Sequence, residues 1–224
     1  VYPVTSPDAE DDFDKEQLGL QWQWNANPKD GWYALDTEKH QLILKAVQRH
    51  ADTITNEPNL LLQKWCMPEF CAETMLNLEA MRSGDMAGLI SLGVTYGAVA
   101  IAKESDAYVI KLIHGKQHFD KEEASAEDII TEVKRLPLTV KEIYFNNTVK
   151  QIPSTEYNQD GPYTFPIPAE TINLGYSLDG GDFEDIYSYP SEAGRWVGVK
   201  NGLFCCHESS GEAGEVRVSY FHFV

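Results

Sequence analysis

Short apolar runs separated by turn residues are the feature that most limits the folds open to this chain. Residues 76–80 alternate apolar and polar side chains, which is the pattern of a strand with one buried face. Residues 140–145 and 216–221 are rich in β-branched and aromatic side chains, which favour strands. Many short strands joined by turns are typical of a β-sandwich or jelly roll. The sequence therefore predicts an all-β protein built from two antiparallel sheets.

Turn signals that contain glycine separate these runs. They lie at residues 83–85, 114–116, 179–181, 192–194 and 200–202. The longest uncharged run, residues 86–102, is shorter than the ~20 residues of a membrane-spanning helix and contains several glycines. It predicts two buried strands with a turn between them.

Two segments, residues 42–50 and 126–136, also fit a helix. In the second segment Ile129, Thr131 and Val133 occupy alternate positions, which is the period of a strand. We therefore predict a strand over residues 126–136, whereas residues 42–50 are read as a helix.

Length suits a single domain over residues 1–224. Sandwiches often occupy roughly 200–250 residues as one unit, and this chain has 224. Such a chain buries roughly 70% of its unfolded surface, so it needs neither a disulfide nor a metal to hold a core. Residues 151–168 are rich in proline, and strand patterns flank them on both sides. They are predicted to form a loop inserted in this domain, not a linker between domains.

The net charge excludes two classes of partner. The chain carries 35 acidic and 18 basic residues, a net charge of −17, and its pI is about 4.6. An acidic surface repels phosphate backbones and anionic lipid headgroups. We therefore expect no nucleic-acid partner and no membrane partner.

Motifs for catalysis or metal binding are missing from the sequence. There is no glycine-rich phosphate loop, and residues 175–179 lack the second glycine of a serine-hydrolase elbow. His114 and His118 have a zinc-ligand spacing, but Gly115 between them predicts a turn. The acidic residues 179–185 lack the order of an EF-hand loop, and we interpret them as a hairpin. The cysteines form no Cys-x-x-Cys motif and are interpreted as small buried side chains: Cys66, Cys71, Cys205 and Cys206.

Several blocks of residues resemble one protein family. The chain opens with Asp11-Asp12-Phe13-Asp14 and continues with Leu18-Gly19-Leu20-Gln21-Trp22-Gln23-Trp24-Asn25-Ala26-Asn27-Pro28. Further matching blocks are residues 59–64, 68–70, 83–89, 176–180 and 194–205. Together they resemble the C-terminal β-sandwich module of family 43 glycoside hydrolases, the β-xylosidase and α-L-arabinofuranosidase group. The blocks span residues 11–223, which is nearly the whole chain.

The resemblance implies a concanavalin A-like sandwich without catalytic residues of its own. In the family, this module follows a β-propeller that carries the catalytic carboxylates, packs on it and is also classed as xylan-binding. The implied partners are therefore a β-propeller catalytic domain of the same protein and a xylo- or arabino-oligosaccharide. No cofactor is implied except a structural calcium near Asp12. Ser219 stands where the family often has Asp, which weakens that calcium site.

Tryptophans are the residues best suited to bind a sugar ring, because flat aromatic faces stack on sugars. The candidates are Trp24, Asn25, Trp32, Trp65 and Trp196, with Asn27 as a further polar partner. A structural role competes with this interpretation, since aromatic side chains dominate sandwich cores. Their two-residue spacing on a strand places Trp22 and Trp24 on one face, and we expect that face to be buried.

These observations predict a non-catalytic accessory or carbohydrate-binding module of a glycoside hydrolase that acts on xylan- or arabinan-type polysaccharide. One alternative is a free-standing β-sandwich glycosidase or lyase, which needs its own carboxylate pair. Neither residues 122–123 nor residues 184–185 supply the Glu-x-Asp-x-x-Glu spacing typical of such enzymes. Another alternative is a protein-interaction sandwich, which would expose an apolar patch. Because xylan-degrading enzymes often work outside the cytosol, we expect an extracellular or periplasmic location, with a cytoplasmic one left open.

Overall fold

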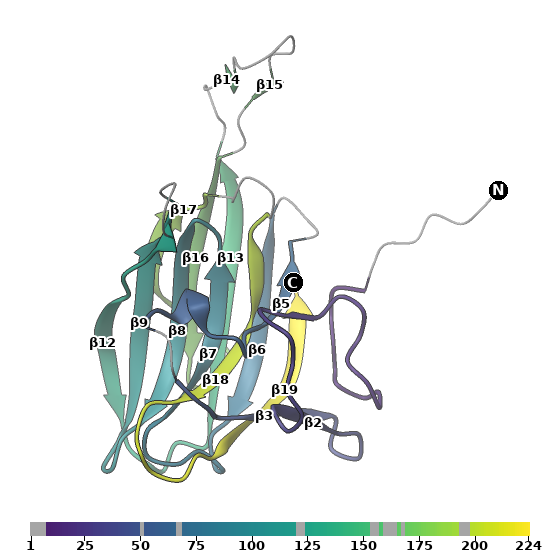
Figure 1. The fold of residues 1–224 in the computed structure, drawn as a ribbon, viewed down its shortest axis with the longest axis vertical. Coiled ribbons are helices and arrows are strands. Elements are labelled where there is room, and N and C mark those ends of the chain that lie inside the picture. Colours follow the sequence, from purple (N-terminus) through teal and green to yellow (C-terminus); the bar gives the residue numbers. More distant parts are fainter. Residues whose placement is uncertain are drawn as a thin grey trace, which may run out of the picture.

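Two β-sheets stacked face to face form the body of the protein (Figure 1). The computed structural model describes residues 8–49, 52–65, 69–119, 124–152, 157–158, 165–166, 169–192 and 198–224. One sheet has eight strands and the other has seven, and neighbouring strands run antiparallel except where β4 joins β18. The prediction of an all-β, two-sheet antiparallel sandwich is confirmed.

The eight-stranded sheet takes its strands from both halves of the chain. Their order is β1 (Gln23–Trp24), β5 (Leu61–Lys64), β18 (Lys200–His207), β7 (Asp85–Leu92), β8 (Thr95–Lys103), β9 (Tyr108–Lys116) and β12 (Ile129–Leu136), with β4 (Val47–Gln48) added parallel to β18.

The seven-stranded sheet likewise mixes early and late strands. Their order is β17 (Glu184–Pro190), β16 (Ala169–Ser177), β13 (Glu142–Ile152), β6 (Phe70–Asn77), β19 (Glu215–Phe223), β3 (Gln41–Lys45) and β2 (Tyr33–Asp36). Two short strand pairs lie outside the sheets: β10 (His118–Phe119) with β11 (Ala124–Ser125), and β14 (Tyr157–Asn158) with β15 (Phe165–Pro166). One 3-10 turn, η1 (Ile54–Asn56), precedes β5.

The main core lies between the two sheets and follows from alternation along each strand. In β6, Ala72 and Leu76 are at most 1% exposed, whereas Glu73 and Met75 point to the opposite face and stay partly exposed. Phe145 in β13 points inward in the same way. The outward positions of the seven-stranded sheet therefore carry the side chains that meet solvent.

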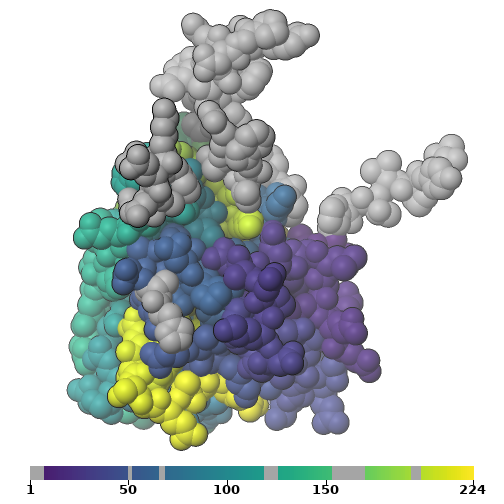
Figure 2. Space-filling model, viewed as in Figure 1, coloured from purple at the N-terminus to yellow at the C-terminus, as the bar shows by residue number. Residues whose placement is uncertain are grey.

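A second apolar layer covers the outer face of the eight-stranded sheet. Met86, Ile90, Tyr96 and Phe204 are each at most 1% exposed there, and Ile54 of η1 packs against them. Figure 1 shows η1 lying across this sheet, and Figure 2 shows the purple N-terminal segment beside the blue segment that contains η1. Strands buried on both faces need apolar residues at every position. This explains why the run of residues 86–102 has no charge.

Arg49 fastens the η1 segment to that face through three ion pairs. Its guanidinium lies 2.7 Å from Asp128, 2.7 Å from Glu208 and 3.4 Å from Glu57. Asp128 also accepts the Tyr96 hydroxyl at 2.8 Å. Burial works against the charged guanidinium, but the hydrogen bond to Glu208 and the negative charges around it outweigh burial and raise the pKa of Arg49. The result is one largely buried ionic cluster beneath the η1 segment.

Four of the predicted turns can be compared with the described strands, and the glycine signal was right at two, residues 83–85 and 179–181, and wrong at two. Gly84 turns the chain into β7 with φ +95°. Residues 114–116 and 200–202 are not turns, since Gly115 lies in β9 and Gly202 in β18. At both places the glycine serves close packing: a Cβ would overlap the Tyr96 hydroxyl at Gly115 and the Leu61 carbonyl at Gly202. Glycine therefore marked a close approach inside a strand.

The predicted hairpin and most of the remaining predicted strands are present in the structure, whereas the predicted helix is not. Residues 179–181 form the predicted acidic hairpin between β16 and β17, and Gly180 has φ +75°. Strands β7, β8 and β12 confirm the predictions for residues 86–102 and 126–136. Residues 42–48 are strands β3 and β4, so the helical reading of that segment is wrong. Parts of the predicted turn at 192–194 and of the proline-rich segment 151–168 lie outside the described residues.

The cysteines behave largely as predicted. Cys205 and Cys206 are free and at most 2% exposed, and burial raises the pKa of each thiol. Cys71 is free and only partly buried on the outer face of β6. Cys66 lies outside the described residues.

Candidate functional site

The N-terminal tryptophans form an aromatic cluster at the edge of the sandwich. The Trp24 ring lies 5.4 Å from Trp32 and 5.6 Å from Tyr33, measured between ring centroids. Trp32 is 7% exposed, and Trp24 is partly buried against the main core. Trp22 is 9% exposed and donates its Nε1 hydrogen to Asp11 at 2.8 Å. Of this group, Trp24 and Tyr33 are only partly buried, whereas Trp22 and Trp32 are buried.

Asn25 is exposed, but its amide already has structural partners. Its Nδ2 donates to the carbonyl of Thr55 at 3.0 Å and to that of Glu57 at 2.9 Å. These bonds join the end of β1 to the η1 segment. Asn27, further along the same loop, is exposed.

Trp65 occupies a different part of the molecule from Trp24. It follows the end of β5, packs edge-on against Phe70 at 5.4 Å, and donates its Nε1 hydrogen to Asn201 at 2.8 Å. The same Asn201 oxygen accepts a bond from Asn147 at 3.0 Å. Trp196 lies outside the described residues. The structure thus brings together Trp24, Asn25 and Trp32, and places Trp65 elsewhere; sugar binding by these residues stays a prediction.

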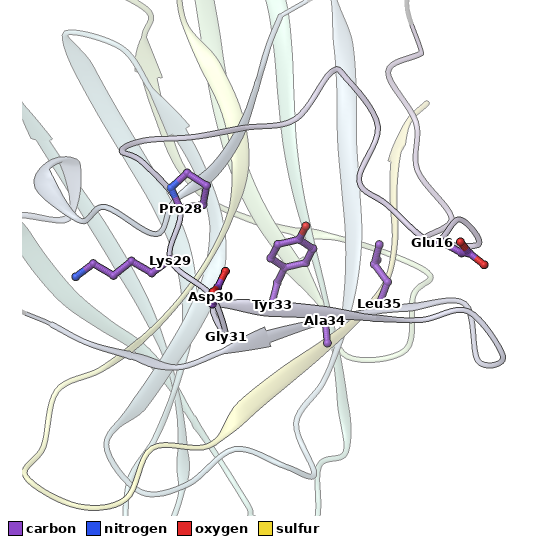
Figure 3. A pocket seen from close by; sticks show the side chains of 8 residues that line it. All are labelled: Glu16, Pro28, Lys29, Asp30, Gly31, Tyr33, Ala34 and Leu35. Atoms are coloured by element: carbon purple, nitrogen blue, oxygen red, sulfur yellow. The ribbon is translucent and has the colours of Figure 1, made fainter.

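An open pocket lies beside the N-terminal cluster (Figure 3). Its lining consists of Glu16, Pro28, Lys29, Asp30, Gly31, Tyr33, Ala34 and Leu35. In Figure 3 the Tyr33 ring stands between Asp30 and Leu35, with Lys29 and Glu16 at opposite ends. Gly31 has φ +85° and open space around its Cα, so it makes the turn that leads into β2. An aromatic wall with charged and polar ends suits a small polar ligand.

The outer face of the seven-stranded sheet is a second candidate surface, which sequence reasoning missed. Cross-strand pairing places one row of residues across five strands: His222, Glu73, Asn146, Gly175 and Asp185. A parallel row contains Met75, Tyr144 and Ser177, and another contains Cys71, Thr148, Asn173 and Ser188. We call the surface formed by these three rows and Tyr220 the outer polar face.

Several side chains of the outer polar face are held in place by one another. Cys71 donates to the Glu73 carboxylate at 3.7 Å and accepts from Thr148 at 3.2 Å. The Tyr220 ring stacks on His222 with centroids 4.5 Å apart. Burial, followed by the nearby Glu73 charge, raises the pKa of Tyr220 to about 12, so its hydroxyl keeps its proton at neutral pH.

Asn146 has an unusual environment on this face. It is 6% exposed, and its Oδ1 has no hydrogen-bond donor among the residues that the structure describes. A Cβ on the neighbouring Gly175 would lie 2.6 Å from that oxygen and 3.3 Å from Asp185 Oδ1. The absence of a side chain at Gly175 therefore lets Asn146 and the Glu184 carbonyl pack closely against its backbone.

The carboxylates of the outer polar face are widely spaced. Glu73 and Asp185 are separated by three strand spacings, or roughly 14 Å between backbones. On the other side, Asp12 is hydrogen bonded to His222 at 2.7 Å. Glycosidases hold their two carboxyl groups roughly 5–9.5 Å apart. Glu73 and Asp185 are therefore too far apart along the row to act as a glycosidase pair.

Asp85, His207 and Ser209 form a hydrogen-bonded chain that has the order of a catalytic triad. His207 lies 2.7 Å from Asp85 and 2.8 Å from Ser209. However, His207 is 1% exposed, and the nearest backbone donor, Gly211, bonds to the Ser209 hydroxyl itself at 3.2 Å. Asp85 also accepts hydrogen bonds from the backbone N–H groups of Arg82 and Gly214. The three side chains therefore fix the loop between β18 and β19 in place.

Metal and membrane signals are weak in the described part of the chain. Among the described residues, no group of three His, Cys, Asp or Glu side chains could hold a metal ion. His114, one of the two spaced histidines, contacts Tyr187 at 3.1 Å. No helix in the same residues is long and apolar enough to cross a membrane.

Comparison with known proteins identifies relatives that are much longer than this chain. A β-xylosidase from Formosa agariphila is 23% identical over 243 residues, covering 99% of this chain and 36% of that protein. A putative β-xylosidase from Xylanibacter ruminicola is 32% identical over 93 residues, covering 42% of this chain and 17% of the relative. The chain thus spans about a third, or less, of the curated relatives that it matches.

Solved structures share the fold. An engineered GH43 glycoside hydrolase with endo-xylanase and exo-arabinofuranosidase activity matches with a TM-score of 0.81 at 18% identity, over all of this chain and 42% of that one. A bifunctional GH43-CE protein from Bacteroides eggerthii matches with a TM-score of 0.69 at 23% identity, over 96% of this chain and 25% of that one. The protein-family model of the β-xylosidase C-terminal concanavalin A-like domain matches residues 10–224. The chain therefore belongs to this family of GH43 C-terminal concanavalin A-like domains.

Proposed function

We propose that this chain is the non-catalytic accessory module of a family 43 glycoside hydrolase that acts on xylan- or arabinan-type polysaccharide. In this role it packs on a β-propeller catalytic domain and binds xylo- or arabino-oligosaccharide. The family match over residues 10–224, together with the short share of each longer β-xylosidase relative that it covers, supports this proposal most strongly.

The physical character of the surface agrees with a neutral glycan as ligand. The net charge of −17 opposes anionic polymers but does not repel a neutral polysaccharide. Two surfaces offer the required chemistry: the pocket beside Tyr33 and the outer polar face. Both combine aromatic rings with amide or carboxylate side chains.

Hydrolysis by this chain alone is the weaker hypothesis. It needs a carboxylate pair at glycosidase spacing, and the separation of Glu73 from Asp185 does not provide one. Turnover of aryl xylosides and arabinofuranosides by the purified chain would favour this alternative. We expect no turnover above the uncatalysed rate.

Binding and gene context test the accessory role. Affinity electrophoresis and titration calorimetry of the purified chain, with arabinoxylan, arabinan and dextran as ligands, should show binding to the first two only. Trp24→Ala tests the N-terminal cluster, and Glu38→Ala, at an exposed position outside the cluster and the pocket, serves as its control. The reading frame that encodes the chain should also encode a β-propeller with catalytic carboxylates. Absence of both a propeller and glycan binding would refute the accessory role.

We also propose an extracellular or periplasmic location, which is supported only by the location of polysaccharide substrates. Cell fractionation with an antibody against this chain tests it. Recovery of the protein solely in the cytosol would refute it.

A further inference from the structure

We propose that the outer polar face is an oligosaccharide-binding surface, distinct from the pocket beside Tyr33, that takes a neutral pentose oligosaccharide across β19, β6, β13, β16 and β17. This inference rests on the proposed function only for the class of ligand. Its location follows from side chains that the family match does not assign.

The row through Glu73 sets the length and direction of the surface. His222, Glu73, Asn146, Gly175 and Asp185 are cross-strand neighbours on five adjacent strands. Four spacings of ~4.8 Å make a row of roughly 19 Å, perpendicular to the strands. That length accommodates several sugar rings in an extended chain.

The row and its neighbours supply the groups that recognise sugar hydroxyls. Glu73 and Asp185 accept hydrogen bonds, and Asn173 both donates and accepts. Tyr220 keeps its phenolic proton and is stacked on His222, so it offers a fixed ring and a donor together. Tyr144 lies in the next row and packs over Gly180, within 3.1 Å of the Cβ position of that glycine.

Asn146 is the residue that points most directly to a ligand. A buried oxygen acceptor without a donor is rare in folded proteins. This oxygen packs 2.6 Å from the Cβ position that Gly175 lacks, so a donor from solvent reaches it only when the Asn146 side chain turns outward. A sugar hydroxyl provides such a donor without introducing a charge.

Other classes of ligand fit this surface poorly. The central row contains two carboxylates and neither Lys nor Arg, so it repels phosphate and sulfate. The surface offers a neutral protein partner little apolar area, since Met75 is the one aliphatic side chain in the three rows. The opposite side of the sandwich, the outer face of the eight-stranded sheet, is already covered by the η1 segment.

Titration calorimetry of the complete chain with xylohexaose and with arabinohexaose tests the proposal. The variants are Glu73→Gln, Tyr220→Phe and Gly175→Ala, the last of which places a Cβ against the Asn146 side chain. Glu79→Gln is the matched control, because Glu79 follows β6, is exposed and lies outside the three rows. We expect Glu73→Gln and Gly175→Ala each to weaken binding by about tenfold or more, and Glu79→Gln to bind like the parent chain. Thermal melting of each variant shows whether it is folded, and Tyr220→Phe carries the test should Gly175→Ala fail to fold.

The possible outcomes separate this inference from the proposed function. Weaker binding by the folded Glu73→Gln and Tyr220→Phe variants, with unchanged binding by Glu79→Gln, supports oligosaccharide binding on the outer polar face. Unchanged binding by both variants, with loss of binding in Trp24→Ala, overturns the inference and leaves the glycan-binding role in place. Absence of binding by the parent chain to both oligosaccharides overturns this inference together with the glycan-binding part of the proposed function.

Discussion

Replacing Arg49 by methionine should lower the free energy of unfolding far more than the same replacement of Arg135. Both arginines meet three carboxylates. Arg49 pairs with Asp128, Glu208 and Glu57 at 2.7, 2.7 and 3.4 Å, with its side chain 12% exposed. Arg135 pairs with three other acidic residues at 2.9, 3.3 and 3.4 Å, with its side chain 44% exposed. The two sites therefore differ mainly in burial.

The magnitude follows from that difference. Without Arg49, the carboxylates of Asp128 and Glu57, 4% and 2% exposed, share a buried site without their guanidinium. Breaking a buried ion pair from one side costs about 3–5 kcal/mol. An exposed pair contributes about 0–1 kcal/mol, so Arg135→Met should change stability by no more than that. For a domain of this length, the Arg49 variant should melt roughly 6–20 °C lower.

Urea unfolding, followed by tryptophan fluorescence, measures both variants against the parent chain. The denaturant midpoint should fall strongly for Arg49→Met. The slope should stay unchanged, because the substitution hardly alters the surface that unfolding exposes. Equal losses for the two variants would refute the reasoning, since burial would then not decide the strength of the ion pairs. A loss below about 1 kcal/mol for Arg49→Met would refute it as well.

Three further predictions concern packing and chemistry. Gly202→Ala places a Cβ against the Leu61 carbonyl and should cost about 1–3 kcal/mol or prevent folding, as measured by urea unfolding; unchanged stability would contradict the close strand approach. Phe145→Ala, at a position with 0% exposure, should cost about 3–5 kcal/mol in the same assay, and a loss below about 1 kcal/mol would mean that the site is not tightly packed. Burial raises the pKa of the Cys205 and Cys206 thiols, so in a Cys66→Ser/Cys71→Ser background both should react with Ellman's reagent only after denaturation, and rapid labelling of the native protein at pH 8 would oppose this.

The sequence was informative about the fold wherever a local pattern decides the outcome. The uncharged run predicted β7 and β8, and the family resemblance covered nearly the whole chain. The alternation at residues 76–80 placed its strand too late, because β6 is Phe70–Asn77 and the chain turns at residues 79–80. Glycine was less reliable, because Gly115 and Gly202 serve close approaches between strands that lie far apart in the sequence. No local pattern distinguishes such a glycine from one in a turn.

The candidate binding surfaces were harder to predict for a related reason. Tryptophan content directed attention to Trp32 and Trp65, which are largely engaged in packing and internal hydrogen bonds. Glu73, Asn146 and Gly175 become neighbours only through the pairing of β6, β13 and β16. Each alternates with core residues along its strand and so points outward, but the order of strands in the sheet decides which of them meet.

The central position of β19 in the seven-stranded sheet constrains how the molecule is made. Residues 215–223 lie between β6 and β3, as Figure 1 shows with the yellow strand, yet they are synthesised long after both neighbours. Until β19 emerges from the ribosome, the facing edges of β3 and β6 lack their partner strand. Pairings between residues so distant in sequence form slowly, and unpaired strand edges invite association with other chains. The nascent protein should therefore depend on chaperones until this strand docks, and a ribosome-stalled chain that ends before residue 215 should remain sensitive to protease.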